Sequence, residues 1–252
     1  MPRRSTRSDG AVAERWIGGE QVNTAVQRAA EGPGGGSSSQ DWTRVETPLA
    51  EEAVNSLRCG QRVRIHGWVY AARDAAHQRL FQLLQEGRQL PIDLRGAVIF
   101  YVGPSPAPPG RLLGAAGPTT AGRVDRFTPA LLRAGLRGMI GKGYRSEAVK
   151  QAMQEYGAVY FAAVGGAGVL LAQHIAAAEV VAYPELGPEA IRRLRLVNFP
   201  AIVAVDRYGG DLYQIGKSTY RRDGAGEPYR HDGPERPGPG EGALSGQADT
   251  SE

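Results

Sequence analysis

The sequence predicts a mixed α/β domain over residues 45–216, flanked by polar extensions over residues 1–44 and 217–252. Three observations support this prediction. Segments with the two-residue period of strands alternate with segments that have helical spacing. Hydrophobic residues make up 41% of the chain, which is enough for a core. The 35 Gly and 17 Pro residues are unevenly spread, so we expect disorder to be local.

The two extensions share a composition that opposes folding. The first ends in a Gly, Pro and Ser run over residues 32–39, and the second is rich in Gly, Pro and charge. Such segments bury too little apolar surface to offset the entropy of ordering. We therefore expect both to be flexible, with one short helix around residues 22–30.

The first half of the domain predicts a strand, a helix and a second strand. Residues 62–70 alternate polar and apolar side chains, which is typical of a strand. Residues 74–86 have apolar side chains at helical spacing, with Asp74 as the predicted N-cap and Gly87 at the C-terminal end. Residues 97–102 form an apolar run of strand length, which stops at Gly103.

The second half predicts shorter elements in alternation. The segments expected to be helices are 128–135, a helix that begins at Ser146, and an apolar helix over 166–178. Those expected to be strands are 138–140, 159–164 and 180–183, with further elements at 188–193 and 201–205. This alternation favours a partly parallel sheet, and it leaves open whether the early long strand belongs to a second sheet.

Composition also limits the function classes. A net charge of +4 over 252 residues is too small to indicate a nucleic-acid or membrane surface. Cys59 is the single cysteine, so this chain can form no internal disulfide and can hold neither an iron–sulfur cluster nor a structural zinc by itself. No apolar run reaches the ~20 residues of a membrane span, and the start lacks the pattern of a secretory signal. We therefore expect a cytoplasmic protein.

A first candidate binding site lies where the predicted strand passes into the helix at Arg73, Asp74 and His77. The unpaired N–H groups of a helix N-terminus attract anions, and here they coincide with a guanidinium and an imidazole. These features favour a carboxylate pocket. The alternative is structural: Asp74 caps the helix, Arg73 is solvated and His77 covers the first turn. On spacing alone the structural alternative has more weight.

A second candidate site combines Thr119, Thr120 and Arg123 with Lys142. Nearby glycines expose the two hydroxyls and several backbone N–H groups, and the guanidinium of Arg123 suits a carboxylate. Lys142 lies between two glycines after a short apolar strand, where the loops of α/β proteins carry ligands. A turn followed by surface cations is an equally weighted alternative.

Several motifs in one order resemble a known family. They are Arg73-Asp74-Ala75-Ala76-His77, Tyr101-Val102-Gly103-Pro104-Ser105-Pro106, Gly117-Pro118-Thr119-Thr120 with Arg123 and Asp125, Gly138-Met139-Ile140-Gly141-Lys142-Gly143, Ala163-Val164-Gly165-Gly166-Ala167 and Phe199-Pro200-Ala201. Together they resemble the β subunit, or C-terminal domain, of class I fumarate hydratases and the related L(+)-tartrate dehydratases. The resemblance covers residues 45–216, and the family usually has methionine where this chain has Val124.

The resemblance implies a swivelling β/β/α domain in a heteromeric hydro-lyase. The cysteine-bearing α subunit of such an enzyme holds a 4Fe-4S cluster, and the active site forms between the subunits. This implies that the chain needs a partner subunit and acts on a small dicarboxylate, with fumarate as the first expectation. L(+)-tartrate dehydratase is the alternative within the same chemistry. A non-catalytic dicarboxylate-binding module is the alternative outside it.

The resemblance also implies roles for six residues. Arg73, Arg123 and Lys142 are the cations that bind substrate carboxylates, and His77 orients the substrate or Arg73. Thr119 and Thr120 line the reacting carbon, with Thr119 as the expected proton-transfer residue. A hydroxyl is a poor base unless neighbouring cations and low solvent access depress its pKa.

Overall fold

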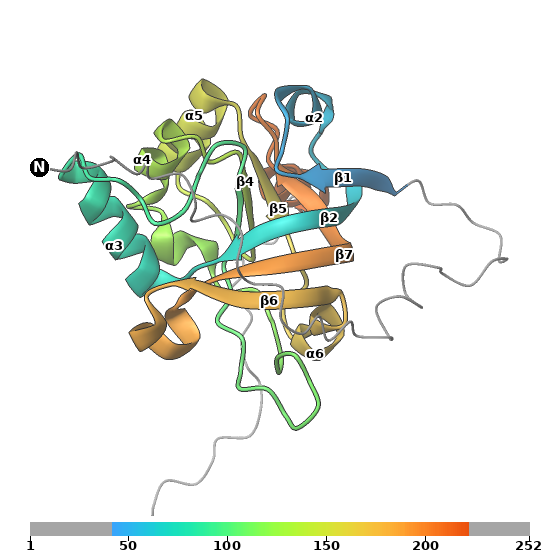
Figure 1. The fold of residues 1–252 in the computed structure, drawn as a ribbon. Helices are drawn as coiled ribbons and strands as arrows, with labels where there is room; N and C mark the ends of the chain where they lie inside the picture. The colour runs from blue at the N-terminus through green and yellow to red at the C-terminus, as the bar shows by residue number, and fades with distance from the viewer. Residues whose placement is uncertain (1–41, 222–252) are drawn as a thin grey trace, which may run out of the picture.

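The computed structural model describes residues 42–221 (Figure 1). The predicted flexible extensions 1–44 and 217–252 lie mostly outside the described residues, as does the short helix expected at 22–30. The first strand, β1 (Thr43–Thr47), and the last helix, α7 (Leu212–Tyr220), contain the predicted domain limits 45 and 216. The ordered structure therefore continues a few residues past both limits.

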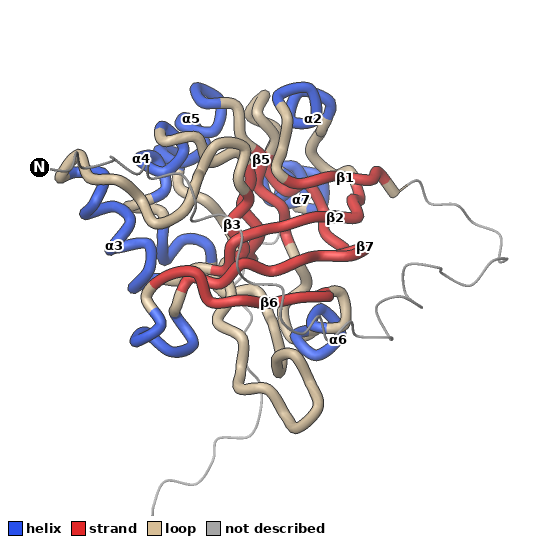
Figure 2. The backbone as a smooth tube through the Cα atoms, in the orientation of Figure 1, coloured by secondary structure: helices blue, strands red, loops and turns tan. Residues whose placement is uncertain are grey.

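A closed barrel of five strands organises the domain. β2 (Arg62–Ala71), β3 (Val98–Phe100), β4 (Gly138–Gly141) and β5 (Val159–Ala162) run parallel, and β7 (Ile191–Val205) pairs antiparallel with both β5 and β2. This last pairing closes the sheet on itself. β1 adds to the first half of β2, and β6 (Ile175–Ala182) adds to the first half of β7. Figure 2 shows β1, β2, β7 and β6 side by side.

Two apolar cores lie on opposite faces of the parallel strands. Alternate residues such as Phe100 and Phe161 belong to the first core, which draws on all five barrel strands and fills the barrel. Their neighbours Ile99 and Tyr160 belong to the second core. That core packs the strands against α3 (Asp74–Gln85), α4 (Thr128–Arg133) and α5 (Glu147–Tyr156). These helices lie together on one side of the barrel in Figure 1.

The mixed α/β prediction is confirmed, and several elements lie where the sequence places them. β2 matches the predicted strand, and α5 begins after Ser146, whose hydroxyl accepts a hydrogen bond from the N–H of Val149. α3 also matches, but Asp74 is not its N-cap. Arg73 holds the N-cap position without a side-chain capping hydrogen bond, and Asp74 is the first helical residue. Its carboxylate is turned toward an arginine of another segment instead.

The largest error concerns residues 166–178, which the sequence predicts as one apolar helix. The structure has a short helix, α6 (Gly168–Ala172), and then β6 from Ile175. The expected element at 188–193 begins in a 3-10 segment, η2 (Pro184–Glu189), and ends in one long strand, β7, which also contains the expected element at 201–205. The remaining short elements are α2 (Glu51–Ser56) and η1 (Ala121–Val124). Within residues 42–221, no helix has the length and apolar character needed to cross a bilayer.

Candidate active site

The candidate site residues lie in loops at one rim of the barrel. The parallel strands β2, β3, β4 and β5 end at the same rim, and Arg73, Tyr101, Lys142 and Gly165 follow them in turn. Loops at the carboxyl ends of parallel strands are where α/β proteins bind ligands. The topology thus brings together residues that are far apart in the sequence.

Backbone hydrogen bonds place Thr119 between the ends of β3 and β4. Its N–H and its hydroxyl both donate to the carbonyl oxygen of Tyr101, at 2.8 and 2.9 Å. Its own carbonyl accepts from the N–H of Lys142 at 3.1 Å, and the carbonyl of Lys142 accepts from the N–H of Ala121 at 2.9 Å. Thr120 forms a β-bridge with Lys142. Thr119, Thr120 and Lys142 are therefore adjacent at the rim.

Arg73 and Arg123 meet around the carboxylate of Asp74. The Nε of Arg123 donates to Oδ1 of Asp74 at 3.0 Å, and Nη2 of Arg73 lies 3.8 Å from Oδ2. Nη2 of Arg73 also lies 3.6 Å from Oε1 of Glu189. The two arginines predicted to bind substrate thus have carboxylate partners within the chain.

The N-terminus of α3 is also met by a carboxylate of the chain itself. Oε2 of Glu189 accepts a hydrogen bond from the N–H of Ala75 at 2.9 Å. Sequence reasoning did not identify Glu189, because it lies 114 residues further along the chain and carries no local signal. One of the N–H groups at the helix terminus expected to hold a ligand carboxylate therefore already has a carboxylate partner within the chain.

His77 is buried beneath the rim and does not face it. Its Nδ1 donates to the carbonyl oxygen of Arg73 at 2.8 Å, since a carbonyl can only accept. Burial lowers the pKa of His77 to about 4, so the ring is neutral at pH 7. The ring packs edge-on against Tyr101, with 5.3 Å between the ring centroids. Of the two roles expected for His77, this geometry suits the orientation of Arg73.

Two glycines make room for the cations. A Cβ atom at Gly103 would lie 2.9 Å from Cδ of Arg73, and one at Gly165 would lie 3.3 Å from Cδ of Lys142. Distances this short leave no space for a side chain in place of the Gly103 hydrogen. The two glycines, which follow β3 and β5, thus form part of the slots that hold Arg73 and Lys142.

Arg145 connects several segments of the site through buried contacts. Its side chain is fully buried, and its guanidinium donates to the hydroxyls of Tyr101 and Thr128 at 3.0 and 2.9 Å. Its Nε lies 2.9 Å from Oδ1 of Asp125 in an ion pair. Because Tyr101 binds Thr119 and Asp125 ends η1, one buried cation connects the threonine and arginine loops. Sequence reasoning assigned no role to Arg145.

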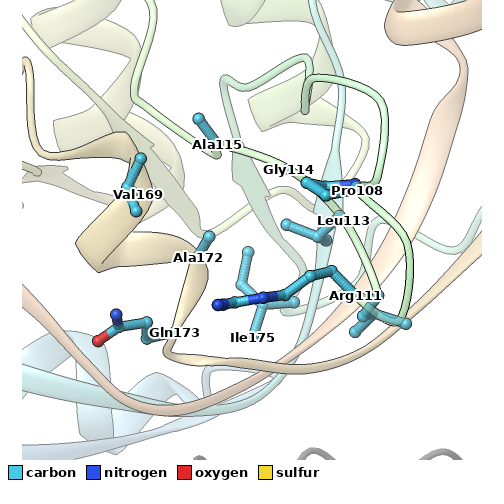
Figure 3. Close-up of a pocket in the computed structure, with 10 residues that line it drawn as sticks. Pro108, Arg111, Leu113, Gly114, Ala115, Val169, Ala172, Gln173 and Ile175 are labelled. Carbon is cyan, nitrogen blue, oxygen red and sulfur yellow. The ribbon is translucent and has the colours of Figure 1, made fainter.

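A cavity of about 310 Å³ lies beside the rim, between loop 108–115 and α6 (Figure 3). The N–H of Ala116 donates to the carbonyl of Gly168 at 2.9 Å, which holds this loop against α6. The lining is mostly apolar and includes Leu113 and Val169, with Arg111 and Gln173 as its polar side chains. None of the six predicted site residues lines it. The rim itself is open, with Lys142, Thr120 and the 53% exposed side chain of Arg123 reaching solvent.

The residues of this chain do not suit an iron–sulfur cluster. Cys59 is its single cysteine, and burial raises the pKa of that thiol to about 11, so it is not a thiolate at pH 7. Among the described residues 42–221, no three His, Cys, Asp or Glu side chains are grouped as metal ligands. The rim instead combines Lys142 and two arginines, which are paired with Asp74 and Glu189, with two hydroxyls, and such groups can bind a small anion.

Comparison with known proteins identifies the sequence family of this chain. The family model described as Fumarase C-terminus matches residues 21–216. The chain is 41% identical over 155 residues to the anaerobic class I fumarate hydratase of Escherichia coli, covering 61% of this chain and 28% of that protein. It is 34% identical to the aerobic class I enzyme of Salmonella typhimurium, covering 80% of this chain and 34% of that protein.

A shorter relative matches almost end to end. The chain is 32% identical to a putative L(+)-tartrate dehydratase subunit beta of Methanocaldococcus jannaschii, over 69% of this chain and 93% of that protein. The chain thus spans about a third or less of the two fumarate hydratases but nearly all of this subunit. On the family model and these relatives, the chain belongs to the Fumarase C-terminus family.

Proposed function

We propose that this chain is the β subunit of a heteromeric, iron–sulfur-dependent hydro-lyase that adds water to fumarate to form L-malate, and reverses that reaction. The observation that carries the proposal is the meeting of Arg73, Arg123 and Lys142 with Thr119 and Thr120 at one rim. A subunit role agrees with the match to a separate β subunit over 93% of its length.

In this proposal the cations hold the substrate by its two carboxylates. Arg73 and Arg123 both reach the carboxylate of Asp74, so they are close enough to share one anionic group of a ligand as well. Lys142 follows a different strand and extends past Gly165. Charge-assisted hydrogen bonds from a planar guanidinium fix the direction of a carboxylate as well as its position. The substrate is therefore held at both ends.

Thr119 is the residue we propose for proton transfer, with Thr120 beside it. The hydroxyl of Thr119 donates to the carbonyl of Tyr101, which leaves its oxygen lone pairs to face a ligand. Its backbone is fixed on both sides by Tyr101 and Lys142. A reacting group held this rigidly loses little orientation freedom on binding, which favours catalysis.

The cluster belongs to the partner in this proposal, because the residues of this chain do not suit it. The open rim is the surface that the cysteine-bearing α subunit would complete, and the domain would swivel against that subunit. The contribution of this chain is to bind and orient the dicarboxylate and to move a proton at the adjacent carbon.

The test is anaerobic co-expression of the full chain with its α subunit, followed by iron reconstitution and assays with fumarate, malate, tartrate and mesaconate. We expect the chain alone to be colourless and inactive, and the complex to hydrate fumarate. An iron–sulfur absorption band or malate turnover from the chain alone would contradict the two-subunit proposal.

A second candidate function is that of an L(+)-tartrate dehydratase β subunit. The near end-to-end match to a relative with that name supports it. Tartrate turnover without fumarate turnover would favour this candidate. Substrate binding by a complex that turns over none of the four acids would instead favour a non-catalytic dicarboxylate-binding module.

A further inference from the structure

We propose that Asp74 is a positioning residue, whose carboxylate orients Arg123 so that the two terminal nitrogens of its guanidinium face the substrate. This inference rests on the function proposed above and extends it to a residue outside the six assigned to the site. It concerns how one cation of the rim is held, and it predicts a specific kinetic signature.

The contact joins two segments that are 49 residues apart. Asp74 is the first residue of α3, and Arg123 lies in η1. Nε of Arg123 donates to Oδ1 of Asp74 at 3.0 Å, while the second oxygen, Oδ2, is directed toward Arg73 at 3.8 Å. Each oxygen of one carboxylate thus serves a different arginine of the site.

The contact leaves the end of the Arg123 guanidinium available. Among the contacts within residues 42–221, Arg123 uses its side-chain Nε and neither of its terminal nitrogens. A guanidinium is planar, so fixing the direction of the Nε–H bond also restricts the direction of the terminal pair. Those two nitrogens can then form a two-pronged contact with a substrate carboxylate.

The position of Asp74 makes its role distinguishable from that of a helix cap. The N–H of Ala75 is satisfied by Glu189, and within residues 42–221 the Asp74 carboxylate pairs with arginines. α3 is also anchored through Ala76 and Leu80, which are fully buried in the second core. Loss of the Asp74 carboxylate is therefore expected to leave the helix in place and to affect mainly the arginines.

Two possible roles of the Asp74 carboxylate predict opposite changes in the KM when it is removed. If Asp74 only neutralises the arginines, it competes with the substrate, and its removal would lower the KM. If Asp74 positions Arg123, its removal lets the guanidinium turn and the KM rises. Arg123 binds a carboxylate that is present before and during the reaction, so the effect belongs mostly to KM and not to kcat.

The experiment compares Asp74→Ala and Asp74→Asn in the complex of the full chain with its cluster-bearing partner. Asparagine keeps an acceptor oxygen for Nε without the charge. We expect the KM for fumarate to rise roughly ten- to hundredfold for alanine, as for the loss of one charge-assisted hydrogen bond, with a smaller rise for asparagine and kcat nearly unchanged. A KM that stays the same or falls for alanine would overturn the proposal.

A matched control and a double variant separate positioning from stability. Glu179→Gln removes a carboxylate from the exposed pair with Arg193, whose atoms lie 3.5 Å apart on the neighbouring strands β6 and β7, and we expect no change in KM. In an Arg123→Ala background, Asp74→Ala is expected to add little further rise in KM. Full additivity of the two effects would show that Asp74 acts on something other than Arg123.

A spectroscopic measurement on the full chain does not depend on activity. The Nε–H of Arg123 should give a slowly exchanging nitrogen-15 NMR signal, which is lost in Asp74→Ala and retained in Asp74→Asn. The same signal in parent and Asp74→Ala would overturn the positioning role. An inactive parent complex with the expected NMR result would instead contradict the proposed function and leave the orientation of Arg123 supported.

Discussion

Replacing Arg145 by methionine tests whether one buried cation supports the rim. Methionine fills similar space but leaves the Asp125 carboxylate, whose side chain is 13% exposed, without its cation, and it leaves the Tyr101 hydroxyl without its donor. Removing one member of a buried ion pair costs about 3–5 kcal/mol. Native domains are typically stable by ~5–15 kcal/mol, so we expect a large loss in the free energy of unfolding.

Urea unfolding of the full chain, followed by far-ultraviolet circular dichroism, measures this loss. Arg145→Lys keeps the charge but cannot reach all three partners, so we expect a smaller loss of about 1–3 kcal/mol from unsatisfied hydrogen bonds. In the double variant Arg145→Met/Asp125→Asn, the unpaired charge is absent and part of the stability should return. A loss below ~1 kcal/mol for Arg145→Met, or no recovery in the double variant, would refute the reasoning.

Three further predictions follow from single contacts. Arg123→Lys keeps the charge but not the planar fork, so we expect kcat/KM of the complex to fall roughly ten- to hundredfold with stability unchanged; kinetics within twofold of the parent would remove Arg123 from the site. Gly103→Ala places a Cβ atom 2.9 Å from Cδ of Arg73 and 3.0 Å from a backbone oxygen, and we expect a loss of about 1–3 kcal/mol in urea unfolding, whereas an unchanged midpoint would show that the slot has space. The pKa of His77 is lowered by burial from 6.5 to about 4, so the unfolded chain binds the proton more readily and stability falls as the pH drops from about 6.5 to about 4. His77→Gln should remove ~3 kcal/mol of this pH dependence, and identical pH profiles of variant and parent would contradict a buried neutral imidazole.

The sequence predicts a helix or strand correctly where nearby residues alone fix its boundaries. β2 follows from alternation along residues 62–70, and α5 follows from the Ser146 cap and an apolar face. Gly157 ends α5 in the left-handed region at φ 65°, where a residue without a Cβ atom is favoured. These features act within a few residues and need no knowledge of the fold.

The prediction fails where pairing between distant segments decides the structure. Residues 175–178, predicted as the end of a helix, have good helix propensity. They instead join the strand predicted at 180–183 in β6, because β7 provides a hydrogen-bonding partner. β7 itself was predicted in pieces because Asn198 and Pro200 interrupt the strand pattern. Asn198 adopts a positive φ of 52°, and Pro200 lies opposite Arg64 in the pairing with β2.

The site shows the same division between local and distant signals. Its six candidate residues could be proposed from the sequence because each lies in a short motif that contains glycines, cations or hydroxyls. Glu189 and Arg145 were missed as parts of the site, since Glu189 contacts α3 from 114 residues away and Arg145 is buried only because Asp125, Tyr101 and Thr128 surround it. Neither hydrophobic alternation nor residue spacing in the sequence identifies a residue whose contacts form only when distant segments pack together.

The barrel interior has a consequence for how this domain can diverge. The core inside the barrel is built from strand residues such as Ile65, Phe161 and Phe199, whereas the candidate site residues lie in the loops and helical segments that follow the strand ends. Exposed positions of those segments, such as Thr120, Arg123 and Lys142, do not belong to the barrel core, so most substitutions there should cost within about ±0.5 kcal/mol of stability. The five strands therefore fix where the rim lies, and the residues that follow each strand decide which polar groups the rim presents.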